Sequence, residues 1–214
     1  MSVACNIEYT NTCNENWMTR TYTQKRRAEQ QAETRRRIVE AAVDLHGRIG
    51  PAQTTITMVA ERAGVQRHTL YAHFPDERSL SLACSGLVFE RDPFPDAEPW
   101  RILGDPGDRL RAGLEAIYGW YERNAALLAC VLRDAEHHAL TKEIVDLRQG
   151  PPMAACRGVL GAGLNAEQRA LLEVSLSFFT WRTLTHDSGL KRRAAAAMMV
   201  RAIGSANKDL KAAR

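Results

Sequence analysis

Apolar residues recur every three or four positions in several stretches of the chain, which is the spacing of amphipathic helices. The first firm stretch covers residues 34–49 and ends where Gly50 and Pro51 break the helix. Because its apolar stripe must be buried, we expect it to pack against the segment that follows. The stripe consists of Ile38, Ala41, Ala42, Leu45 and Ile49.

The next segment has the pattern of two short helices around a tight turn. Residues 57–63 form the first helix, and Gly64 ends it because such a turn favours a residue that tolerates positive φ. Residues 66–74 form the second helix, with Leu70 on its buried side. A small side chain at Ala60 lets the two helices cross closely. This arrangement is a helix-turn-helix, whose second helix lies in the major groove of DNA.

The outward face of this motif is rich in hydrogen-bond donors, which suit base edges and phosphate oxygens. Arg67 is the candidate for a base contact, for example to guanine. Tyr71 and His73 are expected to hold phosphates, with help from Thr55 and Thr57, although a threonine at the start of a helix also serves as its cap. The expected DNA-binding residues are Thr55, Thr57, Gln66, Arg67, His68, Thr69, Tyr71 and His73.

Helical spacing continues toward the C-terminus and is interrupted by one stretch rich in proline and glycine. Residues 92–107 contain four prolines and two glycines, so we expect no regular element there and place the domain boundary in it. Trp100 inside this stretch is expected to anchor packing. The helices expected on either side span residues 76–91, 108–133, 134–149, 153–160, 166–187 and 191–205.

Three stretches carry a family resemblance: LYAHF at residues 70–74, TTITMVAERAGV before it, and TRRRIVEAAVDL upstream. They resemble the DNA-binding domain of the tetracycline-repressor (TetR) family of transcriptional regulators, from about Thr34 to about Leu87. The resemblance implies a homodimer formed through the last two helices, a palindromic DNA operator and a small-molecule inducer. It also implies that ligand binding changes the tilt of the helix at residues 76–91.

Two positions depart from the family pattern. The chain has His46 where family members commonly have Phe, and Glu77 where they commonly have a Lys near the DNA backbone. Because Glu77 cannot donate a hydrogen bond to a phosphate, either Arg78 replaces that contact or the contact is missing.

The predicted fold is all-α, with an N-terminal three-helix helix-turn-helix domain and a C-terminal helical bundle for ligand binding and dimerisation. The expected divisions are a disordered N-terminal extension with a basic arm at 1–33, the DNA-binding domain with its connecting helix at 34–91, a linker at 92–107, and the ligand-binding and dimerisation domain at 108–214.

Charge is concentrated in the basic arm. Between Arg20 and Arg37 seven basic residues face two acidic ones, a net charge of +5, whereas the whole chain has +4. A solvated tail is one interpretation of such a run. Because it adjoins the helix-turn-helix, we expect it to grip phosphates or the minor groove, and to become helical only on DNA.

The C-terminal bundle has the aromatic content of an apolar ligand cavity, although core packing explains the same side chains. Two polar residues, Arg133 and His137, share one helix face and are candidates for polar contacts. The expected ligand-binding residues are Trp120, Tyr121, Arg133, His137, Phe178 and Trp181.

Several other classes of protein are not favoured. No apolar run approaches the roughly 20 residues that cross a bilayer. Five cysteines without paired spacing indicate reduced thiols in a cytoplasmic protein. Asp134 and His138 have the i, i+4 spacing of metal ligands, but two ligands on one helix do not make a site. No phosphate-binding glycine loop or nucleophile elbow is present. We therefore expect no enzyme activity, cofactor or metal.

The sequence predicts a DNA-binding transcriptional regulator, a ligand-responsive repressor that binds a palindromic double-stranded operator as a homodimer. The alternative is a small-ligand-binding or adaptor protein whose helix-turn-helix no longer binds DNA, and Glu77 is the feature that supports it.

Overall fold

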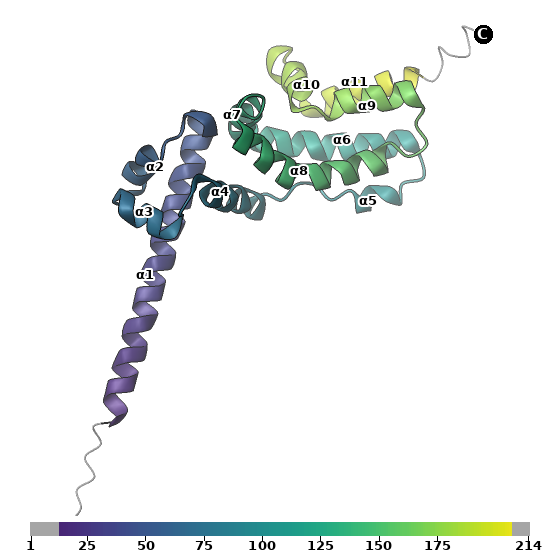
Figure 1. Cartoon of the computed structure of the whole chain (residues 1–214). Coiled ribbons are helices and arrows are strands. Elements are labelled where there is room, and N and C mark those ends of the chain that lie inside the picture. The colour runs from purple at the N-terminus through teal and green to yellow at the C-terminus, as the bar shows by residue number, and fades with distance from the viewer. Residues whose placement is uncertain (1–12, 207–214) are drawn as a thin grey trace, which may run out of the picture.

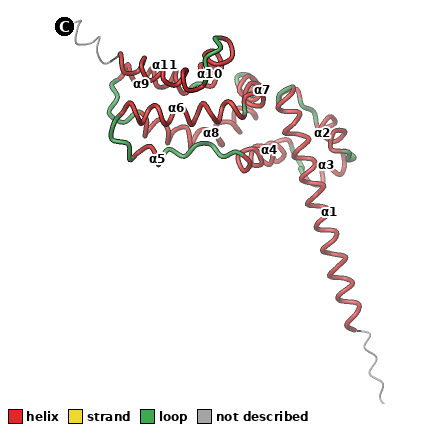
Figure 2. Tube along the Cα trace, turned by 180° about the vertical axis from the view of Figure 1, so that it is seen from behind, coloured by secondary structure: helices red, strands yellow, loops and turns green. Residues whose placement is uncertain are grey.

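A computed structural model of the chain describes residues 13–206, and every regular element in that range is helical (Figure 2), which confirms the all-α prediction. The elements are α1 (Cys13–Arg48), the short 3-10 turn η1 (Pro51–Gln53), α2 (Ile56–Ala63), α3 (Arg67–His73), α4 (Glu77–Arg91), α5 (Glu98–Arg101), α6 (Pro106–Arg123), α7 (Ala125–Ala135), α8 (Ala139–Leu160), α9 (Ala166–Leu176), α10 (Phe178–Arg182), the π-helical turn η2 (Thr183–Asp187) and α11 (Arg192–Ser205).

Buried apolar side chains form two separate clusters. One cluster is formed by helices α1, α2, α3 and α4, and the other by the helices from α5 through α11. We name these the N-terminal and the C-terminal unit. In Figure 1, α4 leads from the N-terminal unit toward α6 and α8, while α9 and α11 lie on the far side of that layer. The two units meet where α1 contacts α7 and where α4 contacts α8.

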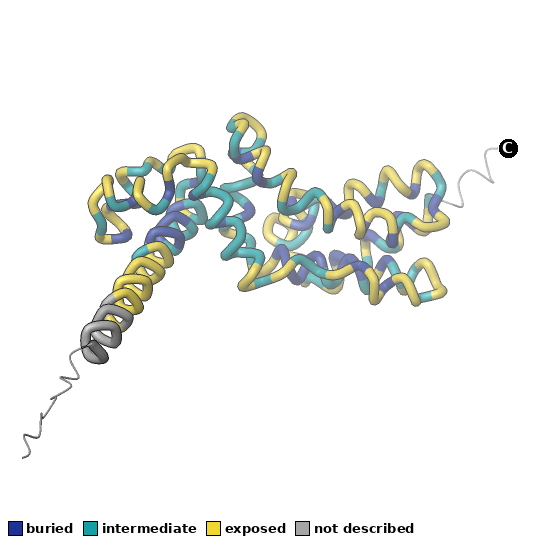
Figure 3. The backbone as a smooth tube through the Cα atoms, turned by 60° about the horizontal axis from the view of Figure 1, so that its bottom comes forward, coloured by how far each residue is buried: buried dark blue, intermediate teal, exposed yellow. Residues whose placement is uncertain are grey.

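Helix α1 is longer than the sequence pattern indicated. It runs from Cys13, so the prediction that residues up to 33 are disordered, or helical only on DNA, is wrong for residues 13–33, while residues 1–12 lie outside the described range. Residues 24–33 contain no glycine, proline or β-branched residue, and such a composition favours helix in water. Their side chains are exposed along the rod that leaves the N-terminal unit (Figures 1 and 3).

The helix predicted over residues 108–133 is divided at Asn124. The Asn124 side-chain amide donates to the Trp120 carbonyl oxygen at 3.0 Å and to Asp92 Oδ2 at 2.7 Å. A polar side chain that bonds to nearby backbone competes with the helical pattern, so α6 ends at Arg123 and α7 starts in a new direction.

The opposite error occurs at Pro151 and Pro152, where two helices were predicted and α8 continues through both prolines. Buried residues lie on both sides of the pair, including Ile144 before it and Cys156 after it. Burial of side chains on both sides of the pair outweighs the hydrogen bonds that two prolines remove.

The helix predicted over residues 166–187 is also interrupted. Ser177 is extended, with φ −71° and ψ 131°, and it separates α9 from α10. The break frees two buried carbonyl groups, and tyrosines of α6 donate to them. The Tyr118 hydroxyl donates to the Ser175 oxygen at 2.9 Å, and the Tyr121 hydroxyl donates to the Leu176 oxygen at 2.6 Å. The tertiary partners therefore stabilise the break.

The stretch at 92–107 is not wholly irregular, because the four-residue helix α5 forms within it and corrects the expectation of no regular element. Trp100 on α5 is 7% exposed and belongs to the C-terminal cluster, which confirms its predicted role as a packing anchor. Burial of one large ring holds a short helix that its own sequence would not maintain.

Candidate nucleic-acid interface and interdomain cavity

The helix-turn-helix forms as the sequence predicts. Gly64 has φ 64° and ψ 40°, and the Val65 amide donates to the Ala60 oxygen at 3.0 Å across the turn. This left-handed ending satisfies carbonyls at the end of α2 and suits glycine. Ala60 and Leu70 are 2% and 0% exposed, so the small and the apolar position pack the two helices together.

The polar face of α3 points away from the rest of the described chain. Four of the predicted contact residues are exposed, namely Gln66, Arg67, His68 and Tyr71. Thr69 and His73 are half-buried on the side toward α1. The side chains expected to enter a DNA groove therefore stand free above a packed core, which is the geometry that major-groove recognition requires.

Thr55 is the cap of α2, because its hydroxyl oxygen accepts from the Met58 amide at 3.2 Å. A hydroxyl that accepts one hydrogen bond still has its own proton to donate. Thr55 can therefore cap the helix and contact a phosphate at the same time. Thr57, the second residue of α2, is also exposed at this end of the helix.

Arg35 on α1 is a residue whose role the sequence pattern did not indicate. Its Nη1 donates to the His73 carbonyl oxygen at 2.9 Å, and its guanidinium lies 4.1 Å from the centroid of the Phe74 ring. These contacts fix the C-terminal end of α3 against α1. Because His73 is 38 positions away in sequence, the residues around Arg35 do not indicate this contact.

Glu77 is exposed in the first turn of α4, and the neighbouring arginine is engaged elsewhere. Arg78 Nη2 lies 2.7 Å from Glu143 Oε1 on α8, an ion pair between the two units. Arg78 is thus directed toward the C-terminal unit in this structure, and the family's phosphate contact at this place has no obvious replacement.

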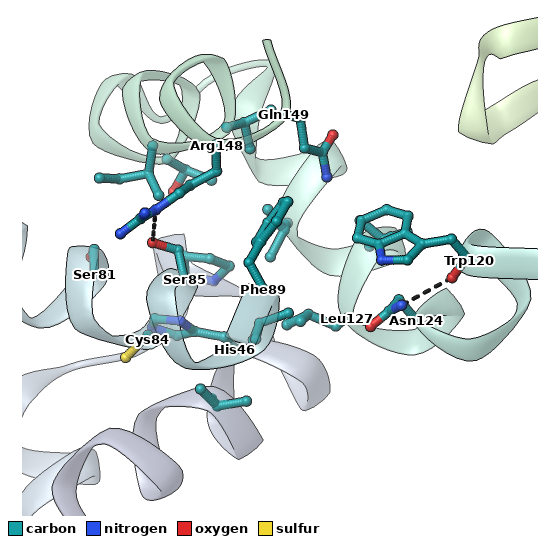
Figure 4. A pocket seen from close by; sticks show the side chains of 18 residues that line it. His46, Ser81, Cys84, Ser85, Phe89, Trp120, Asn124, Leu127, Arg148 and Gln149 are labelled. Atoms are coloured by element: carbon teal, nitrogen blue, oxygen red, sulfur yellow. Dashed lines mark hydrogen bonds between the residues drawn. The ribbon is translucent and has the colours of Figure 1, made fainter. Parts of the chain in front are cut away.

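A partly open cavity lies where the two units meet. It has a volume of about 80 Å³ and a mostly apolar wall formed by α1, α4, α6, α7 and α8. Figure 4 shows Ser85 of α4 and Arg148 of α8 meeting across it, with Arg148 Nε 3.1 Å from Ser85 Oγ. Arg148 Nη2 also donates to the Leu82 carbonyl oxygen at 3.0 Å. Any molecule in this cavity would touch both units.

The six predicted ligand residues do not line one cavity, which corrects that prediction. Trp120 alone lines the cavity between the units. Tyr121 and Phe178 border a separate surface groove, and Trp181 borders a third hollow. The four aromatic rings pack on one another as core, with Tyr121 contacting both Phe178 and Trp181. His137 is exposed on the surface.

Arg133, the sixth of these residues, belongs to a contact between the units that we name the Asp134 clasp. Asp134 on α7 is 1% exposed, and its Oδ2 accepts from the Ala52 amide of η1 at 2.9 Å. Arg133 Nε donates to Asp134 Oδ1 at 2.9 Å, while its Nη2 donates to the Ile49 oxygen at 3.0 Å. Gly50, at φ 96°, leaves room for the carboxylate. The clasp ties α7 to the turn that precedes α2.

His46 at the end of α1 lines the cavity between the units. Burial lowers the pKa of His46 to about 4, against a weaker opposing effect from the negative charge of Asp134. The imidazole is therefore neutral at pH 7 in the folded protein. The chain thus places an uncharged polar group where the family commonly has an apolar ring.

Cys84, Cys130 and Cys156 are free thiols. Burial raises the pKa of Cys84 to about 12 and that of Cys156 to about 11. A protonated, buried thiol is a poor nucleophile. Neither of these two residues therefore has the properties of a reactive cysteine.

Clusters that could hold a metal ion and helices that could span a membrane are both absent from the described part of the chain, residues 13–206. No group of three or more His, Cys, Asp or Glu side chains lies close enough there to hold a metal ion, and the Asp134 carboxylate is occupied by the clasp. None of these helices combines the length and the apolar character needed to cross a membrane.

Comparison with known proteins supports the resemblance seen in the sequence. Residues 38–84 match the family model described as "Bacterial regulatory proteins, tetR family". The HTH-type transcriptional repressor KstR of Mycolicibacterium smegmatis is 32% identical over 109 residues, which is 50% of this chain and 52% of that protein. The matched part of the chain therefore spans about half the length of this relative.

Solved structures share the fold at low sequence identity. A TetR-like regulator from Rhodococcus sp. RHA1 has a TM-score of 0.57 and 21% identity, over 82% of this chain and 97% of that one. FadR of Bacillus subtilis, solved in complex with stearoyl-CoA, has a TM-score of 0.56 and 15% identity, over 78% and 96%. A TetR-family regulator from Streptomyces coelicolor has a TM-score of 0.55 and 18% identity, over 81% and 80%. The matched model therefore assigns residues 38–84 to the tetR family of bacterial regulatory proteins, and the chain shares the fold of solved TetR-family regulators.

Proposed function

We propose that the protein is a DNA-binding repressor of transcription whose activity responds to a small molecule. The observation that carries this proposal is the exposed polar face of α3 above a packed helix-turn-helix core. In this function Arg67 reads a base edge, while Tyr71 and His73 hold phosphates and fix the register. Thr55 and Thr57 add hydroxyl donors at the start of α2.

The proposed assembly is a homodimer on a palindromic operator. Three apolar side chains are unusually exposed on the helices near the C-terminus: Val174 on α9 at 50%, Phe179 on α10 at 41% and Met198 on α11 at 44%. A second copy of the chain would cover them. A two-fold dimer sets the two α3 helices one helical turn of DNA apart, or a multiple of a turn.

The cavity between the units is the proposed effector site, in place of the aromatic cluster expected from the sequence. Its walls come from α4 on one side and from α7 and α8 on the other. A ligand larger than the present space would push α4 away from α8 and change the spacing of the two α3 helices. The proposal assigns no cofactor and no catalytic role, and it places the protein in the cytoplasm beside its operator.

The test begins with selection of duplexes from a random pool by the full chain, followed by affinity measurements on the enriched sequence. Arg67→Ala should weaken binding by about 1 to 3 kcal/mol and relax the preference at one position of each half-site. Arg111→Ala, which removes the same charge from an exposed site on α6, is the control and should bind normally. Equal weakening by Arg67→Ala on all sequences would make Arg67 a phosphate contact instead.

A second candidate is a ligand-binding or adaptor protein whose helix-turn-helix no longer binds DNA. Two observations favour it, namely the exposed Glu77 and the engagement of Arg78 with Glu143. A footprint on the DNA that flanks its own gene distinguishes the candidates. Protection supports the repressor, whereas absence of both a footprint and any enriched duplex supports the adaptor.

A further inference from the structure

The protruding part of α1 and the recognition helix α3 enclose a groove, which we name the extension groove. It has a volume of about 770 Å³ and is open to solvent. One wall comes from residues 27–35 of α1 and the other from residues 68–73 of α3. It adjoins the polar face of α3, so whatever lies in it also lies beside the molecule that α3 contacts.

The walls of this groove have the chemistry of an anion site. Among the described residues that line it, none is acidic, and Arg27, Arg35, His68 and His73 all contribute. The remaining polar lining consists of amide and hydroxyl side chains, which donate hydrogen bonds without charge. A polyanionic backbone is therefore the complementary occupant.

Charge on α1 is divided between the faces of the helix. At 3.6 residues per turn, Arg27, Gln31 and Arg35 share the face toward α3. Glu29, Glu33 and Glu40 fall on the opposite side of the helix by the same geometry. Two of them are paired with arginines there: Arg36 lies 2.8 Å from both Glu33 and Glu40, and Arg91 lies 2.7 Å from Glu40. The face of α1 that lines the groove therefore presents no carboxylate.

The two walls are held at a fixed separation. Arg35 donates to the His73 oxygen and covers the Phe74 ring, which joins α1 to the end of α3. On the N-terminal side of this contact, residues 13–34 continue as helix for about 33 Å, close to one turn of B-DNA. A rod of this kind loses less conformational entropy on binding than a flexible arm.

We propose that the extension groove holds the sugar-phosphate backbone of one operator strand, next to the bases that α3 contacts. This inference rests on the proposed function, because it deepens the same DNA contact. Arg27 supplies the charged phosphate contact, with Gln30, Gln31 and Thr34 as neutral donors on the same face. The α1 extension thus acts as the second wall of a clamp whose first wall is the recognition helix.

The experiment compares Arg27→Gln with Arg26→Gln in the full chain. The two variants remove the same charge from adjacent, exposed positions, but Arg26 does not line the groove and lies over the Tyr22 ring instead. The probe is the duplex enriched by the wild-type chain, extended by about ten base pairs on each side to match one turn of DNA. Affinity is measured against salt concentration, and ethylation interference maps the phosphates that matter.

Arg27→Gln should lower affinity roughly fivefold to tenfold per lost contact near 0.1 M salt, and should reduce the salt slope by about 2 for a dimer. It should also abolish interference at one phosphate in each half-site, beside the bases whose readout depends on Arg67. Arg26→Gln should change affinity less than about twofold and leave the interference pattern intact.

The possible failures are distinct. Equal effects of the two variants on a bound operator, or an unchanged interference pattern, would overturn the clamp and leave the repressor function in place. If the wild-type chain enriches no duplex, both the repressor and the clamp are wrong. Retention of operator binding by Arg27→Gln together with loss of binding to RNA or to a protein would assign the groove to that partner and also refute the clamp.

Discussion

The two units of the molecule use their side chains in opposite ways. The N-terminal unit packs small and aliphatic residues around one ring, Phe74, and leaves the donors of α3 in solvent. The C-terminal unit buries most of the aromatic residues in its core and directs their polar atoms inward. Its large buried rings are Trp100, Tyr118, Trp120, Tyr121, Phe178 and Trp181.

This difference shows where each unit can bind another molecule. In the N-terminal unit the core supports α3, and the polar side chains on the outer face of α3 remain free to form hydrogen bonds with another molecule. In the C-terminal unit the hydroxyls of Tyr118 and Tyr121 are spent on carbonyls at the break after α9. Burial accordingly raises the pKa of both phenols. The cavity lies at the boundary between the two units, where the two kinds of packing meet.

The largest expected effect is a loss of folding stability, and it distinguishes the buried face of α3 from its exposed face. Leu70→Ala should lower the free energy of unfolding by about 2 to 5 kcal/mol, because Leu70 is fully buried and its removal leaves a cavity. Its neighbour Tyr71 is 44% exposed, and Tyr71→Ala should change stability by less than about 1 kcal/mol while weakening operator binding. Urea denaturation and DNA affinity are measured on both variants.

The reverse result would contradict this division. Similar stability losses from the two substitutions would mean that Tyr71 supports the fold and is not free to contact DNA. Loss of operator binding by Leu70→Ala under conditions where it remains folded would mean that the packing of α3, not only its outer face, sets recognition.

Sequence reasoning succeeded where structure is set by near neighbours. Gly64, Ala60 and Leu70 lie within one motif, and local spacing places each of them correctly. It failed where distant partners decide, since the breaks at Asn124 and Ser177 depend on side chains and carbonyls of other helices. The continuation of α8 through its two prolines has the same cause, because packing outweighs the local signal.

The candidate sites show the same division. Exposure of the polar side chains of α3 follows from a helical pattern and was predicted. The six residues expected at one ligand site are dispersed, because a list of aromatic residues does not say which of them face one another. Asp134 was considered only as a metal ligand, and no local pattern shows that its carboxylate accepts from the Ala52 amide 82 positions away.

A second prediction concerns the clasp that joins the two units. Gly50 and Gly64 both have positive φ, but a Cβ at Gly50 would overlap the Asp134 carboxylate, whereas one at Gly64 meets nothing within 4 Å. Gly64→Ala should therefore cost about 1 kcal/mol of folding stability, from backbone strain alone. Gly50→Ala should cost about 3 kcal/mol, because it adds the loss of a buried hydrogen bond to strain.

The contribution of the carboxylate is isolated by a double-mutant cycle. In an Asp134→Ala background there is no carboxylate to displace, so Gly50→Ala should cost about 2 kcal/mol less than it does in the wild type. Additive effects would mean that the left-handed backbone of Gly50 accounts for the whole penalty, and that the clasp does not constrain the turn before α2.

The smallest of the three expected effects is a change in the pH dependence of folding stability, and it tests how far the cavity between the two units is closed to water. Folding lowers the pKa of His46 to about 4 from 6.5, so the unfolded chain binds a proton below pH 6.5 that the folded chain refuses. Stability from this group is complete above pH 6.5 and is lost as the pH falls toward 4, by about 2 kcal/mol at pH 5. His46→Phe should remove this loss of stability at low pH. In urea denaturation, the difference in unfolding free energy between His46→Phe and the wild type should therefore favour the variant more at pH 5 than at pH 7.5.

His137→Gln, at an exposed site, serves as the control for removal of a histidine and should keep the wild-type pH profile. If His46→Phe and the wild type lose stability in parallel, then His46 titrates freely, and the wall of the cavity is open to water rather than closed between the two units.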